Sequence, residues 1–528
     1  MADWFLRRVL LHGLPPATVQ ACLSQREVRT LLRFRFAYLF AFHGPVLIPL
    51  LEALGGQQDP ALSVLSLGVA SVAMVVSDVP TGLYADRQGS KAALRLGLRL
   101  SCIVLVSFFA LTMARAHSLQ QGQTGPWLPG IVGLLVLEGA IGVSLSLLSG
   151  ADTVLFLGVL RRAGIQGLQS TGSEGLGSAI RYIGTMISVA IGALLYDLSA
   201  WLLPHPALRL ALQSGLFLLT LGSQLVALKA LRQIAEVPSL TTAPRSRPGF
   251  HDVVRGLYAL TRFPAFAVQL WLLCLLSAIA LFAVYLFQSP LSRLTTELVQ
   301  TSWLFCPIYV ITAVLGYWAC SRGSRDAHRV HDRDAEALTP TGNLSAARSP
   351  AAATEPNTSP ASLADPPASL AITAPLTGLA LGLLLLYPLV DWARLAWQGP
   401  APSLSSRLGF VAVAAASCLL FNYIRGFVEP YSAATLVRFT QAHALAVPAS
   451  IISGFNSLKR GMHFLLSVLF YAVRTRGPST SGLDRDHELS RMLLYVLGGL
   501  LLLALPGLWR HRLRPPPIGS GTGESLSA

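Results

Sequence analysis

The chain has 528 residues, of which 53% are hydrophobic and only 12% are charged, and its formal net charge is +15. A soluble domain usually carries about a quarter charged residues, so this chain has too few to cover a globular surface. Its apolar residues form long runs, many of which reach the roughly 20 residues needed to cross a bilayer. The composition therefore excludes an ordinary soluble protein and predicts an all-α polytopic membrane protein.

The apolar runs predict twelve membrane-spanning helices in two sets of six. The first six are expected over residues 34–54, 61–84, 94–116, 127–150, 175–197 and 206–230. The second six are expected over residues 264–288, 297–320, 372–394, 405–429, 445–473 and 490–513.

Four segments are expected outside these helices: an N-terminal segment, a basic connector, an insertion in the second half and a tail. They cover residues 1–33, 231–263, 322–371 and 514–528, which leaves bundles at 34–230 and 264–513. The insertion is rich in Ala, Pro, Ser and Thr and cannot bury enough apolar surface to fold, so we expect it to be disordered, and the tail likewise.

The positive charge follows membrane topology. Arginines lie mostly in hairpins between apolar runs, as in Arg87 to Arg95 and at Arg161 and Arg162, while loops 55–60 and 198–205 have no basic residue. The positive-inside rule then places both termini in the cytoplasm, with the chain in the inner (plasma) membrane. The loop 474–491 departs from this pattern because it carries four arginines. No aromatic-interleaved basic face is present, so we expect the lipid bilayer, and no nucleic acid, as a partner.

A repeat relates the two halves. Gly82 and Gly89 of the hairpin Val79–Lys91 are matched by Gly316 and Gly323 at an offset of 234 residues (316 − 82). A second pair of similar segments, which begin at Ser149 and at Ser432, has an offset of 283 residues (432 − 149). The difference of 49 is close to the length of the insertion 322–371, so its removal brings the halves into register. Two related halves are typical of a transporter with a site between them.

The hairpin resembles the signature of the major facilitator superfamily, roughly Gly-x-x-x-Asp-Arg-x-Gly-Arg-Lys. The matching residues are Gly82, Asp86, Arg87, Gly89 and Lys91, with Ser90 in place of one basic residue. The lead-in from Asp78 to Gly82 resembles the Glu-x-Pro-Thr-Gly form of bacterial permeases, and Ser149-Gly-Ala-Asp152 is similar to the same subgroup.

The resemblance implies a twelve-helix fold and secondary transport by alternating access. It implies that helices one, four, seven and ten line a central cavity, and that Asp86 holds the two halves together on the cytoplasmic side. The second hairpin has Cys320 at the corresponding position, so such a latch is expected on the N-terminal half alone. We assign gating to the six residues Asp78, Gly82, Asp86, Arg87, Gly89 and Lys91.

Ionisable or polar side chains inside spans are the candidates for substrate or proton coupling, because each charge costs about 2.5–3.5 kcal/mol at mid-bilayer unless paired or wetted. They are His43, Glu138, Asn422, Arg425 and Glu429. Glu138 could load and release a proton, and Arg425 could hold an anionic substrate. The alternative is structural pairing, either of Glu138 with Arg425 or of Arg425 with Glu429 one turn apart.

These patterns predict a secondary active transporter of a small molecule that acts as a monomer, with proton coupling as a hypothesis and export of a drug or metabolite slightly favoured over uptake. No GxxxxGK[ST], HExxH or GxSxG motif is present, so we expect neither an enzyme nor a cofactor. His328 and His331 begin the low-complexity insertion and indicate solvated charge rather than a metal site. The alternative is a non-transporting membrane scaffold or receptor that retains the fold and docks through residues 322–371.

Overall fold

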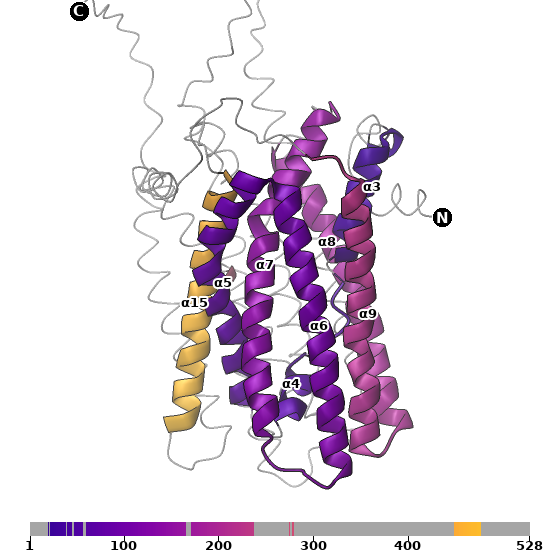
Figure 1. The fold of residues 1–528 in the computed structure, drawn as a ribbon, viewed down its shortest axis with the longest axis vertical. Coiled ribbons are helices and arrows are strands. Elements are labelled where there is room, and N and C mark those ends of the chain that lie inside the picture. The colour runs from indigo at the N-terminus through magenta and orange to yellow at the C-terminus, as the bar shows by residue number, and fades with distance from the viewer. Residues whose placement is uncertain are drawn as a thin grey trace, which may run out of the picture.

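The computed structural model describes residues 20, 22–38, 40–44, 47–55, 60–164, 170–236, 274, 277–278 and 448–476. In these residues the chain forms helices and no β-strand. The long helices stand side by side with their axes roughly parallel (Figure 1). The helices are α3 (Arg26–Tyr38), α4 (Leu47–Gly55), α5 (Pro60–Gln88), α6 (Ser90–Gln120), α7 (Leu128–Arg162), α8 (Ser170–Leu202), α9 (Pro206–Gln233) and α15 (Pro448–Arg476).

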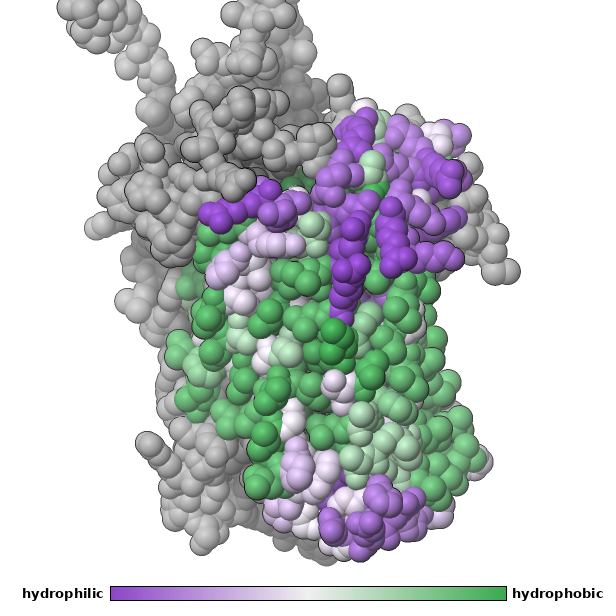
Figure 2. Space-filling view, in the orientation of Figure 1, coloured by the Kyte–Doolittle hydropathy of each residue, from purple (hydrophilic) through white to green (hydrophobic). Residues whose placement is uncertain are grey.

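Four stretches of the described helices are long and apolar enough to cross a membrane. Their outward side chains are exposed and apolar, as at Ile103 (64% exposed) and Val226 (60%). Figure 2 shows hydrophobic surface as a band across the middle of the bundle, with hydrophilic surface gathered at its two ends. Such a band is stable in lipid rather than in water, which confirms the prediction of a membrane-spanning helical protein. The four stretches are Leu65–Gln88, Ser90–Gln120, Leu128–Leu160 and Pro206–Gln233.

Six predicted helices, those over 61–84, 94–116, 127–150, 175–197, 206–230 and 445–473, each coincide with one helix of the structure. Each observed helix ends later in the chain than predicted, most of all α7, which continues to Arg162. Its last turns are buried by neighbouring helices, as at Leu155 and Phe156 (each 0% exposed). Burial in protein, rather than the thickness of the bilayer, therefore sets the length of α7.

The prediction of one helix over residues 34–54 is wrong. The segment forms α3, which begins eight residues earlier (34 − 26), and α4, and residues 40–44 between them are not α-helical. The sequence Gly44-Pro45 explains the break, because proline lacks an amide donor and disfavours a helical conformation in the residue before it. The start of α3 at Arg26 also brings part of the predicted N-terminal segment 1–33 into the bundle, where Val28 and Leu31 are buried.

Most of the predicted second half lies outside the described residues. Cys274, Ser277 and Ala278 are described from the predicted helix 264–288, and α15 from the predicted eleventh helix. The other predictions that fall outside are the helices over 297–320, 372–394, 405–429 and 490–513, the insertion 322–371, the second hairpin 316–325, the tail 514–528 and the connector 231–263 beyond residue 236.

Small residues bring α7 close to α5 and α6. A Cβ at Gly142 would overlap the backbone of Ala70 on α5. On the other side of α7, the Ser144 hydroxyl donates to the Gly97 carbonyl oxygen of α6 at 2.9 Å. Helices in lipid associate through such close packing and interhelical hydrogen bonds, since lipid provides no hydrophobic driving force between them. The contacts make α7 the central helix of the described bundle.

A buried ion pair joins α3 to α7. Arg35 Nε donates to Asp152 Oδ1 at 3.0 Å, and the Tyr38 hydroxyl donates to Asp152 Oδ2 at 2.7 Å. The Arg35 guanidinium carbon also lies 3.8 Å from the centroid of the Phe156 ring. Arg35 is 1% exposed and Asp152 is 3% exposed, so neither charge could be solvated by water if the other were removed.

Replacement of Asp152 by asparagine should therefore lower the free energy of unfolding by about 3–5 kcal/mol, because the buried Arg35 charge loses its counter-charge. Thermal unfolding of the purified protein in detergent measures this loss. The matched control is Glu27→Gln, which breaks the partly exposed pair of Glu27 with Arg162 (29% and 34% side-chain exposure, respectively) and should cost about 1 kcal/mol or less. Equal stability of the two variants would contradict the assignment.

Candidate functional site

The hairpin between α5 and α6 is built around Gly89. Its φ of +95° lies in the region that favours glycine, and it ends α5 and starts α6 without a further residue between them. A Cβ at this position would meet the carboxylate of Glu236, which follows α9. That carboxylate accepts the Lys91 backbone amide at 3.3 Å, at the N-terminus of α6, where a negative charge is favourable.

Lys91 lies across the end of α9. Its Nζ donates to the carbonyl oxygens of Arg232, at 3.3 Å, and of Ile234, and the residue is 8% exposed. A cation is stabilised at a helix C-terminus, whose last carbonyl groups have no partner within the helix. The last basic residue of the signature therefore ties α6 to α9. We call this end of the bundle, where α5 ends and α6 begins, the basic end.

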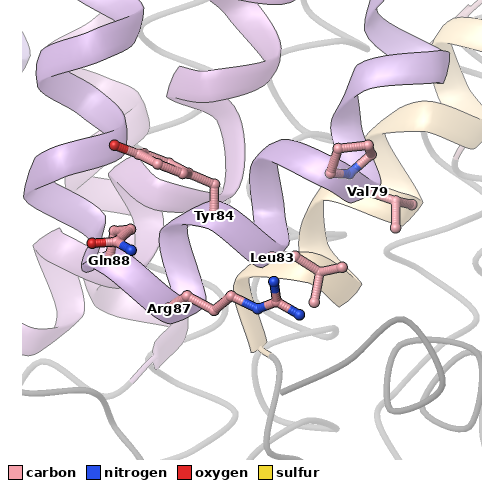
Figure 3. A pocket seen from close by; sticks show the side chains of 6 residues that line it. Val79, Leu83, Tyr84, Arg87 and Gln88 are labelled. Carbon is pink, nitrogen blue, oxygen red and sulfur yellow. The ribbon is translucent and has the colours of Figure 1, made fainter. Parts of the chain in front are cut away.

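The remaining signature residues occupy the last two turns of α5. Gly82 is buried, Asp86 is half-buried and Arg87 is exposed. A surface depression of about 420 Å³ lies beside them, and Figure 3 shows that the labelled side chains that line it all come from this one helix. A substrate site between two halves requires residues from both of them, so we do not assign the depression as that site. Its lining residues are Val79, Pro80, Leu83, Tyr84, Arg87 and Gln88.

Asp78 contacts the second half of the chain. The Ser457 hydroxyl of α15 donates to Asp78 Oδ2 at 2.9 Å, and Asp78 is 0% exposed. Lys459 and Arg460 of α15 lie close enough to act on this carboxylate electrostatically. Within the first half, the Thr81 hydroxyl of α5 lies 2.7 Å from the Ser146 hydroxyl of α7.

A second polar contact follows further along the same two helices. The Ser71 hydroxyl of α5 lies 2.8 Å from His463 Nδ1 of α15, and both residues are buried. Since a residue earlier in α5 meets one later in α15, the helices are antiparallel, and Figure 1 shows them side by side along their length. A buried polar seam thus joins α5 of the first half to α15 of the second.

The break between α3 and α4 is held by hydroxyl groups of two other helices. The backbone amide of Ala41 donates to Ser188 Oγ of α8 at 3.2 Å, and that of Phe42 donates to Thr220 Oγ1 of α9 at 3.1 Å. Gln224 Nε2 donates to the Tyr38 carbonyl oxygen, at the end of α3, at 2.6 Å. Such contacts satisfy backbone groups that the helix no longer pairs and that lipid cannot solvate.

His43 lies within this break and faces α9. Its Nδ1 is 3.2 Å from Thr220 Oγ1, and its ring centroid is 5.0 Å from that of Phe217. These contacts hold the broken segment against α9, which is a structural role that the sequence did not indicate.

Glu138 lies on α7 and is 2% exposed. Its Oε1 is buried and has no hydrogen-bond partner among the described residues. Asp152 follows fourteen residues later (152 − 138), about four helical turns, so the two acids share one face of α7. Asp152 is fully paired with Arg35 and Tyr38, whereas the described structure provides no counter-charge for Glu138.

Sequence reasoning missed the Arg35–Asp152 pair as a site. Asp152 belongs to a motif that the sequence analysis identifies, but it lies two residues beyond the end of the predicted helix 127–150. Arg35 is the second residue of the predicted helix 34–54. The rule that singled out Glu138, an ionisable group inside a span, applies equally to both residues. Asn422, Arg425 and Glu429 lie outside the described residues, so the predicted pairing of Glu138 with Arg425 stays a prediction.

No protein-family model and no curated protein matches the sequence. Solved structures do resemble it. A D-xylose–proton symporter is 14% identical, with a TM-score of 0.55 over 92% of this chain and 97% of its own. The nucleoside transporter NupG is 13% identical, with a TM-score of 0.51 over 92% of this chain and 99% of its own.

Similarity over nearly the whole length of both chains, together with the apolar helices, defines the class of the protein by its fold. The chain is an all-helical, membrane-spanning protein with the major facilitator fold, as the hairpin resemblance predicted.

The break between α3 and α4 depends on the close approach of α8. A Cβ at Gly192 of α8 would overlap the carbonyl oxygen of Phe42, and this backbone atom cannot move aside cheaply. Gly192→Ala should therefore lower the free energy of unfolding by about 3 kcal/mol, measured by thermal unfolding in detergent. Gly215→Ala is the control, since its Cβ would meet nothing within 4 Å and alanine favours a helix by about 0.5–1 kcal/mol. A neutral Gly192→Ala would refute the close packing.

Proposed function

We propose that the protein is a secondary active transporter that moves a small molecule across the membrane by alternating access of its two halves. The fold supports this class of function, and the buried seam between α5 and α15 supports a closed interface between halves. The similar solved structures are a sugar–proton symporter and a nucleoside transporter, so we expect a polar small-molecule substrate. We expect both termini in the cytoplasm, the inner membrane as location and a monomer as the working unit.

Glu138 carries the proposal that transport is coupled to protons. An isolated charge inside a span is costly, and such residues mark substrate and proton pathways unless they are paired. On the same face of α7, Asp152 has both of its carboxylate oxygens bonded and is neutralised by Arg35. Glu138 has no such partner in the described part of the chain. It can therefore gain and lose a proton without breaking an ion pair of the described bundle.

The test is flux in vesicles reconstituted with the purified protein under an imposed pH gradient, with sugars, nucleosides and organic anions as the compounds screened. We expect the gradient to accelerate movement of one of these classes. Glu138→Gln should abolish the acceleration and leave exchange of labelled for unlabelled compound intact, because glutamine cannot release a proton.

Glu27→Gln is the matched control, since it makes the same chemical change at a partly exposed position outside the apolar band. It should keep gradient-driven flux. If Glu138→Gln keeps it as well, Glu138 is not the coupling residue.

We further propose that the contact of Asp78 with Ser457 is a latch between the halves, acting beside the predicted latch residue Asp86. A hydrogen bond to a buried carboxylate contributes about 1.5–3 kcal/mol. Its loss should release α15 from α5 and change the balance between the two access states.

Ser457→Ala should therefore speed amide hydrogen exchange in α15 by roughly tenfold or more, measured by mass spectrometry of the detergent-solubilised protein. The matched control is Ser107→Ala, because the exposed Ser107 hydroxyl bonds only within its own helix, to the Ile103 carbonyl oxygen. Unchanged exchange of α15 in Ser457→Ala would exclude the latch.

The alternative function is a non-transporting scaffold or receptor that retains the fold. It predicts no flux for any class of compound in the vesicle assay, and binding of a protein partner to residues 322–371 instead. Direction is tested in the same vesicles, since export by antiport requires a pH gradient opposite to that which drives symport.

A further inference from the structure

Helices α6 and α9 together form a surface on the outside of the bundle, separate from the interface between α5 and α15. The two helices are antiparallel neighbours: Lys91 contacts the Arg232 carbonyl oxygen at the basic end, and Phe108 stacks on Phe217 further along, with ring centroids 5.2 Å apart. Figure 1 shows them side by side on the face turned to the viewer. Figure 2 shows this face uncovered, with hydrophilic surface at the basic end directly above hydrophobic surface.

Four basic residues meet on this face. Arg95 and Arg99 are four residues apart on α6, and Lys229 and Arg232 are three apart on α9, so each pair shares one face of its helix. Arg99, Lys229 and Arg232 are exposed, and Arg95 is half-buried. Arg99 follows Lys91 by eight residues, which corresponds to roughly 12 Å along the axis of α6. All four cations therefore lie within about two turns of the basic end.

These cations have no acidic counterpart on their own helices. Neither α6 nor α9 contains an aspartate or a glutamate. The acid nearest in sequence, Glu236, accepts the backbone amide of Lys91. The salt bridges Arg35–Asp152 and Glu27–Arg162 of the described residues do not involve this surface.

The surface next to the cations is apolar and partly open. Leu96 (44% exposed) and Ile103 (64%) lie on α6, and Leu225 (51%) lies on α9. Gly222 and Gly215 precede Lys229 by seven and fourteen residues, so they continue its face of α9 away from the basic end. A Cβ at either glycine would meet nothing within 4 Å. Together they leave a strip of α9 that a bulky side chain does not fill.

We propose that this surface binds an anionic phospholipid, whose headgroup contacts Arg95, Arg99, Lys229 and Arg232 and whose acyl chain lies along the strip at Gly222 and Gly215. The cations lie where the apolar band ends, which is the level of lipid headgroups. Charge complementarity selects a negative headgroup, and the open apolar strip beside it selects a molecule with a hydrocarbon chain. The site is independent of transport, since it faces lipid rather than the interface between the halves.

The experiment is native mass spectrometry of the full chain in detergent, titrated with dioleoyl phosphatidylglycerol or with dioleoyl phosphatidylcholine. We expect one phosphatidylglycerol to bind in clear preference to phosphatidylcholine. The double variant Arg99→Gln/Lys229→Gln should weaken phosphatidylglycerol binding by about thirtyfold, the loss expected when two cations leave the membrane surface. Gly222→Leu, which fills the strip and keeps every charge, should weaken it as well.

The charge-matched control is Arg26→Gln/Arg33→Gln, which removes two exposed arginines of α3. It should bind phosphatidylglycerol as the unaltered chain does, and both double variants should keep the unaltered melting temperature. Equal weakening in the two double variants would mean that net charge alone attracts the lipid, and unchanged binding in Arg99→Gln/Lys229→Gln would mean that it binds elsewhere. Either result overturns the proposal, and full affinity in Gly222→Leu overturns the place given to the acyl chain.

Discussion

Lipid cannot solvate a charge or an unpaired backbone group, and the described structure depends on how the protein meets this constraint. The clearest case is the pair of Arg35 and Asp152, two buried charges that neutralise one another and hold α3 to the central helix α7. The break after α3 follows the same logic, because Ser188 and Thr220 supply the hydrogen bonds that the interrupted helix has lost. At the basic end Lys91 does so for the last carbonyl groups of α9.

The same constraint makes a buried charged group without a neutralising partner a candidate for a functional role. Glu138 lies on the same face of α7 as Asp152, at a similar depth of burial, yet its Oε1 has no partner in the described chain. A buried acid without a counter-charge is retained at a cost in stability. That contrast within one helix face is the reason to propose Glu138 as the coupling residue. Asp78 is a different case, since it accepts a hydrogen bond from Ser457 of α15, in the second half of the chain.

The outer surface also reflects its surroundings. The face of α6 and α9 carries cations at one end and apolar side chains beyond them, and neither helix contains an acid. An excess of basic residues near the membrane surface sets the orientation of a chain during insertion. Clustered on one outer face and placed next to an open apolar strip, the same residues also suit the headgroup and chain of one anionic lipid. Orientation and lipid binding can thus arise from a single set of side chains.

Local sequence determined which segments cross the membrane and where the α5–α6 hairpin lies, since length, hydropathy and glycine spacing depend on neighbouring residues alone. The interruption of the first span also had a local signal, in Gly44-Pro45. Tertiary structure decided which polar residues are satisfied. Arg35 and Asp152 are 117 residues apart in sequence, and Lys91 and the carbonyl of Arg232 are 141 apart. Hydropathy cannot distinguish a paired charge from an unpaired one, because pairing depends on which helices become neighbours, and that is decided when small residues let α7 approach α5 and α6.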